Sequence, residues 1–215
     1  MMMNHSNATP ANAAQRVAYS NLAHQVVGML LGAVGVLAGL ESFGVVSGIW
    51  LYAWPVLLLV VGLFVPLFIW AVARRHHVRL PQVLADPQQR QHFILSGVIF
   101  GGGLAETLRV AGVLPGLLGY VWPLALILIG LGFVTHTQHG TSEAMVKAVR
   151  AHRLLGGTAI LAGLARGLQV GPGDRAGVVG LGWIVLILLT ALQFLIYHEP
   201  EGAYATGDSH HHAGR

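Results

Sequence analysis

Histidines are the residues of this sequence with the clearest capacity for chemistry. The segment HTQHGTSEAMVKAVRAHR, residues 136–153, places three of them between two strongly apolar stretches. Imidazole nitrogens are good ligands for copper, zinc and iron, including haem iron. We therefore take His136, His139 and His152 as candidate metal ligands.

Other ligand chemistries are poorly represented. The chain has no cysteine, which excludes thiolate metal sites, iron–sulfur clusters and cysteine nucleophiles. Of its five methionines only Met29 falls well inside an apolar stretch, which argues against a Cu(I) relay on sulfur. A di-iron carboxylate site needs several glutamates on neighbouring helices, and too few lie near the histidines. The remaining candidates are a histidine-ligated haem b, or Cu(II) or Zn(II) bound by imidazoles.

The composition is that of a membrane protein. Hydrophobic residues make up 54% of the 215 residues and charged residues 9%, whereas about 25% are charged in soluble domains. The chain has twelve Lys and Arg and eight Asp and Glu, which is a modest excess of positive charge. It has no basic segment in which aromatic residues alternate with Lys or Arg. We expect the lipid bilayer as the main partner, other membrane subunits as further candidates, and no nucleic acid.

Six apolar blocks approach the roughly 20 helical residues that a bilayer core requires. Three of them are interrupted by charged residues, including Glu41, Glu106 and Arg166. We interpret all six as spanning helices and predict an all-α membrane protein with six transmembrane helices. The blocks are residues 23–46, 49–73, 93–114, 117–135, 154–170 and 176–197.

The six blocks form three pseudo-repeated helical hairpins. In each copy a histidine opens a glycine-rich block, and a tryptophan follows 30 or 31 residues later. The sequences around the three tryptophans are also similar: YAWPVLLLVVG, YVWPLALILIG and LGWIVLILLTA. A repeated unit of this kind buries its apolar faces only against its neighbours. The pairs are His24 with Trp54, His92 with Trp122, and His152 with Trp183.

This repeat divides the chain into five predicted segments. Residues 1–20 form an N-terminal tail, and residues 21–78, 79–140 and 141–200 form the three hairpins. Residues 201–215 form a tail that we predict to be disordered; its GDSHHHAGR sequence is a weak metal-binding signal.

Positive charge is concentrated on one side of the predicted helices. Nine of the twelve basic residues lie in the tails or in the two longer connections on that side. Because cytoplasmic loops of membrane proteins are enriched in Lys and Arg, we predict a bacterial inner-membrane protein with both termini in the cytoplasm. The three tryptophans then lie near the outer interface, where amphipathic rings are favoured.

In this topology the histidines share one membrane level. They stand at the start of each odd-numbered helix and at the end of each even-numbered helix, so they gather near the cytoplasmic leaflet. An interfacial polar role explains a single such histidine, whereas a shared site for haem b or copper explains the set. The candidate cofactor ligands are His24, His92, His136, His139, His152 and His198.

A histidine followed by glycine-rich text, as in HRLLGGTAILAGL at 152–164, resembles bacterial copper-resistance D-type membrane proteins and membrane b-type cytochromes. The resemblance covers short stretches and implies copper handling or transmembrane electron transfer, with histidines as ligands. The glycines fit two interpretations, close helix packing or a flat macrocycle held against backbone.

A second group of residues is ionic and belongs to the opposite side. Glu106 and Arg109 are three residues apart on one helix, and Arg166 follows its histidine at the same offset as Glu106. Glu41 takes the offset of Arg109. Because an unpaired charge inside a membrane costs a few kcal/mol, we predict a buried ion pair of Glu106 with Arg109 or Arg166. Such a cluster fixes helix register or forms a proton or anion path.

Three functions therefore remain open. The first is binding of haem b or a transition metal, copper in particular, for electron transfer or metal handling. The second is a non-catalytic accessory or assembly subunit of a membrane complex, and the third is a small transporter that uses the ionic cluster. The sequence carries none of the catalytic motifs of known enzyme classes that bind nucleotides or activate a serine, and it leaves open whether the protein is an enzyme.

Overall fold

The computed structural model describes residues 10–136, 142–171 and 178–200, and this part of the chain is helical without a β-strand. Short helices η1 (Gly48–Tyr52), α3 (Leu80–Ala85) and α5 (Pro115–Leu118) lie in the connections. The long helices are α1 (Pro10–Ser42), α2 (Ala53–Arg75), α4 (Pro87–Val110), α6 (Val121–Val134), α7 (Ser142–Val170) and α8 (Val178–Ile196).

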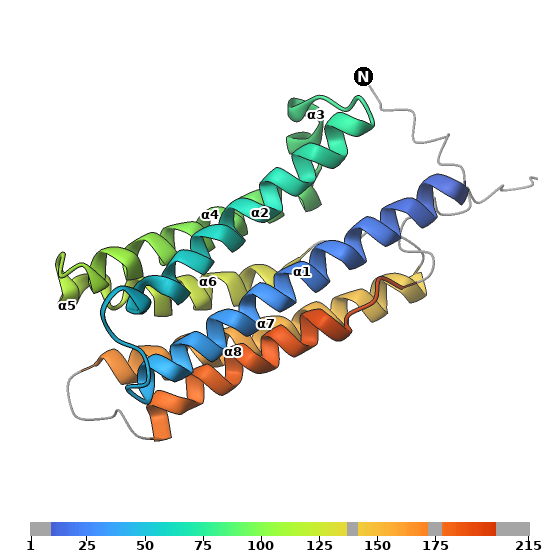
Figure 1. The fold of residues 1–215 in the computed structure, drawn as a ribbon. Helices are drawn as coiled ribbons and strands as arrows, with labels where there is room; N and C mark the ends of the chain where they lie inside the picture. Colours follow the sequence, from blue (N-terminus) through green and yellow to red (C-terminus); the bar gives the residue numbers. More distant parts are fainter. Residues whose placement is uncertain (1–9, 137–141, 172–177, 201–215) are drawn as a thin grey trace, which may run out of the picture.

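The long helices lie side by side in one bundle, and each packs against two others (Figure 1). Their order around the bundle is α1, α2, α4, α6, α7, α8 and back to α1. The bundle is thus closed on itself, and its interior is filled by aliphatic side chains such as Val34, Leu58 and Ile187, each at most 2% exposed.

Glycines set the distance between neighbouring helices. A Cβ at Gly28 of α1 would lie 3.0 Å from the carbonyl oxygen of Ala191 in α8, and one at Gly103 of α4 would lie 3.1 Å from that of Pro55 in α2. These contacts are the close helix approach that small residues permit in lipid. The glycines of the odd-numbered blocks that meet a neighbour in this way therefore serve helix packing.

Local sequence accounts for the start of α4. Asp86 precedes Pro87, and its side chain accepts hydrogen bonds from the backbone N–H groups of Gln88 and Gln89 at 2.8 and 3.4 Å. Asp86 therefore caps α4, and Pro87 stands in its first turn, where a missing N–H costs no hydrogen bond. The predicted tail 201–215 lies outside the described residues.

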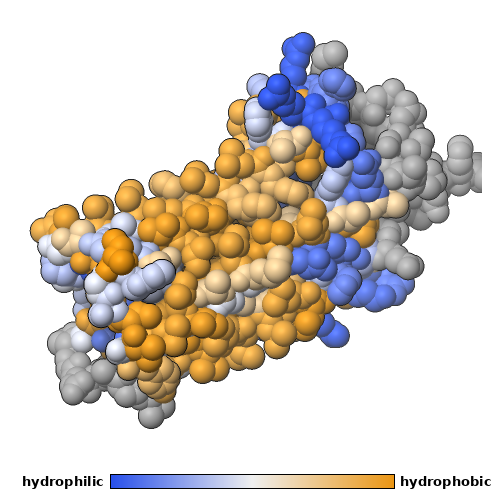
Figure 2. Space-filling model, viewed as in Figure 1, coloured by the Kyte–Doolittle hydropathy of each residue, from blue (hydrophilic) through white to orange (hydrophobic). Residues whose placement is uncertain are grey.

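The outer surface of the bundle suits a bilayer. In the described part of the chain four segments are long and apolar enough to cross a membrane, namely Ala14–Ser42, Gly48–Arg75, Pro87–Val110 and Pro115–Val134. The apolar stretch of α8, Gly180–Ile196, is shorter, and α7 carries charged residues along its first third. In the view of Figure 2, which is that of Figure 1, apolar residues cover most of the visible face of the bundle, and strongly hydrophilic residues gather at one end. The chain is a membrane protein.

The tryptophans of the three matching segments lie inside the bundle. Trp54, Trp122 and Trp183 are each 1% exposed, and the rings of Trp54 and Trp183 lie 5.8 Å apart between centroids. The sequence predicts them at the level of the outer interface. Their rings point into the bundle rather than towards lipid, so each fills core volume that a smaller apolar side chain would leave empty.

Candidate functional site

Four histidines from four helical segments lie next to one another at one end of the bundle. His24 comes from α1, His92 from α4 and His152 from α7, and His136 follows Thr135, the C-cap of α6. Ring centroids are 6.2 Å apart for His24 and His152, 4.8 Å for His152 and His136, and 4.9 Å for His136 and His92. We call these four residues the histidine row.

The hydrogen bonds of the histidine row fix the same tautomer in three helices. Nδ1 of His24 donates to the carbonyl oxygen of Ser20 at 2.7 Å, four residues earlier. His92 and His152 repeat this contact at 2.8 Å, to Gln88 and Ala148. A carbonyl oxygen only accepts, so Nδ1 carries the hydrogen and the lone pair of each neutral ring is on Nε2.

His136 reaches the same state through a glutamine. The side-chain nitrogen of Gln91 donates to the carbonyl oxygen of Gly132 at 2.7 Å, which turns its oxygen towards Nδ1 of His136, 2.8 Å away. Nδ1 is therefore again the donor. In many metal sites a histidine ligates through one ring nitrogen while the other donates to a carbonyl or carboxylate, as these rings do.

Aromatic side chains enclose the histidine row. Tyr197 lies 4.6 Å from His24 and 5.5 Å from His152, measured between ring centroids. Phe194 stacks on His24 at 5.8 Å, and Phe133 lies 5.9 Å from His152. His136 and His152 are both buried. His24 and His92 are half-buried, so the row is partly shielded from water and its rings lie in mutual contact.

The segment after α8 is tied to α1 at Ser20 and Asn21, beside the row. Ser20 Oγ donates to the Glu199 carboxylate at 2.5 Å, and the Glu199 backbone N–H donates to Asn21 Oδ1 at 2.7 Å. Burial raises the pKa of the Glu199 carboxyl above its ordinary value, and hydrogen bonds lower it by less. The C-terminal end of the described chain is therefore held against α1 at the histidine end.

The structure separates two of the predicted ligands from this group. His198 is exposed, and its Nδ1 is 2.9 Å from the carbonyl oxygen of Ile196. His139 lies outside the described residues. Within residues 10–136, 142–171 and 178–200, no three His, Asp or Glu side chains are already arranged as a metal-ligating group.

The ionic cluster occupies the opposite end of the bundle. Glu106 is completely buried in α4, and its carboxylate contacts Arg109 Nε at 2.5 Å and Arg166 Nη2 at 3.4 Å. Arg166 also donates to Gln169 Oε1 at 2.7 Å, and its guanidinium lies 4.8 Å from the ring centroid of Trp183. Glu106 therefore contacts both arginines that the sequence offered as alternatives.

A cavity of about 310 Å³ adjoins this cluster. Glu41 lies on its wall and accepts a hydrogen bond from Trp54 Nε1. Five of the six long helices contribute to the lining, which consists of Ala38, Glu41, Ser42, Trp54, Arg109, Arg166, Gln169, Val170 and Trp183.

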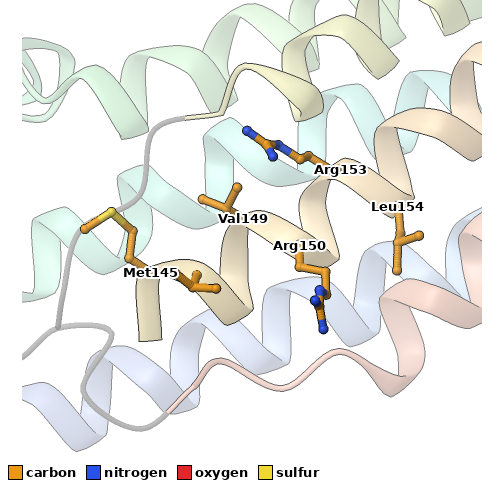
Figure 3. Close-up of a pocket in the computed structure, with 6 residues that line it drawn as sticks. Met145, Val149, Arg150, Arg153 and Leu154 are labelled. Carbon is orange, nitrogen blue, oxygen red and sulfur yellow. The ribbon is translucent and has the colours of Figure 1, made fainter. Parts of the chain in front are cut away.

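A second hollow lies on the outside of the bundle. This groove has a volume of about 560 Å³ and is lined by Met145, Val146, Val149, Arg150, Arg153 and Leu154. Figure 3 shows its labelled side chains along α7. All of these residues belong to one helix, and both arginines are exposed. The groove is therefore a surface feature of α7, separate from the buried histidine row.

Sequence reasoning missed the residues that orient the histidines. Gln91, Tyr197 and Ser20 carry no motif, and their roles depend on how neighbouring helices are rotated. Gln91 carries one sequence signal. It is an amide next to His92, and the residues that follow His92 are mostly apolar.

Comparisons with models of protein families, with curated protein sequences and with solved structures find no match for this chain.

Proposed function

We propose that this chain is a polytopic inner-membrane protein that holds one transition metal ion, copper in the first place, on the histidine row. The observation that carries the proposal is the common state of the four rings. Each donates through Nδ1 to a backbone or glutamine oxygen, so each has its lone pair on Nε2. Neutral imidazoles with an oriented second nitrogen are good ligands for Cu(II) and Zn(II).

The distances between the rings support an ion shared by several histidines. Two imidazoles on one ion have ring centres about 5–6 Å apart, because each metal–nitrogen bond is about 2 Å long. Neighbouring rings in the row are separated by 4.8, 4.9 and 6.2 Å. His136 and His152 are nearly parallel, at 22°, so binding requires rotation of these side chains to turn their Nε2 atoms towards one point.

The packing around the row favours an ion over haem b. A macrocycle needs a flat slot between its two axial ligands, whereas His24 contacts Phe194 and Tyr197 directly. The close helix contacts of Gly28 and Gly103 leave no space for a macrocycle against those residues. Metal handling is therefore the primary proposal, and transmembrane electron transfer through haem is its rival.

We infer that α7 and α8 also cross the membrane, as the second half of the closed bundle and as the third of three pseudo-repeated hairpins. This inference is supported by helix packing, because α7 contacts α6 and α8 contacts α1 within the same bundle. The exposed basic residues Arg75, Arg90 and Arg153 belong to segments at the histidine end. By the positive-inside rule that end, with both termini, faces the cytoplasm.

An absorption spectrum and a metal analysis of the purified full-length protein test this function. Bound copper or zinc without a Soret band supports the ion. A Soret band that is lost in His152→Ala supports haem b instead. A colourless preparation that is free of metal, and that takes up none when copper is supplied, contradicts both and favours an accessory-subunit role.

A further inference from the structure

The groove on the outside of α7 combines charged and apolar side chains. Arg150 and Arg153 are exposed, and so are the apolar residues Val146 and Leu154 beside them. In Figure 3 the side chains of the two arginines extend from α7 in opposite directions. An exposed apolar surface next to two guanidinium groups is suited to a partner that is itself amphipathic.

Neither arginine of the groove has a carboxylate partner among the described residues. Every Lys or Arg salt bridge in this part of the chain uses Glu106 or Glu143. Glu143 is the only acidic residue of α7, and it pairs with Lys147. It precedes Arg150 by seven residues, about 10 Å at 1.5 Å per residue. The positive charge of Arg150 and Arg153 is therefore available to a negatively charged partner.

Exposed leucines continue from the groove along the same face of α7. Leu154, Leu161 and Leu168 recur every seven residues, which is close to two helical turns, and are 61%, 54% and 51% exposed. Gly157 lies between the first two, and a Cβ at this position would meet nothing within 4 Å. From Leu154 to Leu168 this face is about 21 Å long, more than half of a bilayer core of about 30 Å. An acyl chain of one leaflet therefore has room along it.

The two arginines stand where this apolar face reaches the histidine end. His152 lies between them in the sequence, so they share the level of the histidine row. Positive charge assigns this end of the bundle to the cytoplasm. Anionic phospholipids are concentrated in the cytoplasmic leaflet, and exposed Lys and Arg near its surface attract them.

We propose that this groove binds an anionic phospholipid of the cytoplasmic leaflet, with its phosphate on Arg150 and Arg153 and an acyl chain along Leu154, Gly157 and Leu161. Guanidinium donors match the geometry of phosphate oxygens. The apolar face that continues from the arginines favours a lipid over a soluble phosphate. A zwitterionic lipid carries its own cation beside the phosphate and complements the two arginines less well. The proposal rests on the inferred membrane crossing of α7 and is independent of metal binding.

The test measures lipid contact at Leu161 in metal-free, full-length protein reconstituted in nanodiscs. Because the chain has no cysteine, Leu161→Cys carries a single fluorescent label at an exposed position. Phosphatidylglycerol or phosphatidylcholine with brominated acyl chains quenches the label on contact. We expect both lipids to quench it, with an affinity about tenfold higher for phosphatidylglycerol.

Two double variants in the labelled protein separate the groove from general surface charge. Arg150→Gln with Arg153→Gln should abolish the preference, so that both lipids quench the label equally. Arg75→Gln with Arg90→Gln is the matched control. It removes two exposed charges from the same end of the bundle but none from the groove, and it should keep the preference.

Four results would overturn the proposal. Equal quenching by the two lipids in the otherwise unchanged protein means that the groove does not select an anionic headgroup. A preference that both double variants lose equally belongs to surface charge in general. A preference that inorganic phosphate removes, and chloride at the same ionic strength does not, assigns the arginines to soluble phosphate. If neither lipid quenches the label, this face of α7 does not meet the bilayer, and the inferred membrane crossing of α7 fails with it.

Discussion

Gly130 of α6 and Gly156 of α7 bring their backbones together so closely that a Cβ on either would lie 2.6 Å from the carbonyl oxygen of the other. Only a residue without a side chain fits at such a distance, and the contact sets the separation of α6 and α7 near His136 and His152.

Because of this contact, we expect two neighbouring alanine variants to differ in stability. Gly156→Ala forces the two backbones apart and should lower stability by about 1–3 kcal/mol, the usual cost of overpacking. Gly157→Ala, one residue on, meets open space and should leave stability unchanged or slightly higher. Thermal unfolding in detergent checks both, and equal melting temperatures for the two variants would contradict the packing.

The buried carboxylate of Glu106 should stabilise the fold through its two arginines. Glu106→Gln leaves both guanidinium groups without their counter-charge, and breaking a buried pair in this way costs roughly 3–5 kcal/mol. Glu143→Gln is the control, because the Glu143–Lys147 pair is exposed and water screens it. Unfolding titrations with SDS compare the two, and a loss no greater in Glu106→Gln than in Glu143→Gln would refute the prediction.

The burial of the Glu199 carboxyl should make the stability of the protein depend on pH. Its pKa is raised by burial, so the folded state holds the proton more tightly than the unfolded state. The stability that the protonated Glu199 carboxyl contributes is fully present below its pKa in the unfolded state, near 4.5. That stability is lost as pH rises through its pKa in the folded state.

Glu199→Gln, which mimics the protonated carboxyl, should therefore melt at a higher temperature than wild type at pH 8. At pH 4 the difference should disappear. Melting curves across this range measure it, and a difference that grows as the pH falls would have the wrong sign.

The absence of cysteine makes the topology directly testable. Ser47 is exposed in the connection between α1 and η1, at the end away from the histidine row, and Ala85 is exposed in α3 at the other end; each is replaced by cysteine in a separate variant. A maleimide that cannot cross membranes should label Ser47→Cys in spheroplasts and Ala85→Cys only after permeabilisation. The reverse pattern would place the termini outside the cytoplasm.

The sequence predicted the helical class and the residues of chemical interest because charged and imidazole groups stand out in apolar helices. The cap at Asp86 was predictable for the same local reason. The inward position of Trp54, Trp122 and Trp183 was not, since an indole suits both a headgroup interface and a core. Which glycines touch, and which side chains orient His136, depend on helix rotations that no single segment specifies.

Copper binding to the histidine row is the central claim, and Cu(II) titration followed by electron paramagnetic resonance tests it most directly. The three tail histidines at 210–212 also chelate copper, so the titration uses full-length protein with these three replaced by alanine. We expect roughly one tightly bound ion per chain, with hyperfine structure from several nitrogens.

His24→Phe and His152→Phe keep an aromatic ring in place but remove a ligand, and each should abolish tight binding. His198→Ala, at an exposed position, should retain it. If folded protein without the tail histidines binds no copper, or if binding is unchanged in both phenylalanine variants, the histidine row is not a metal site.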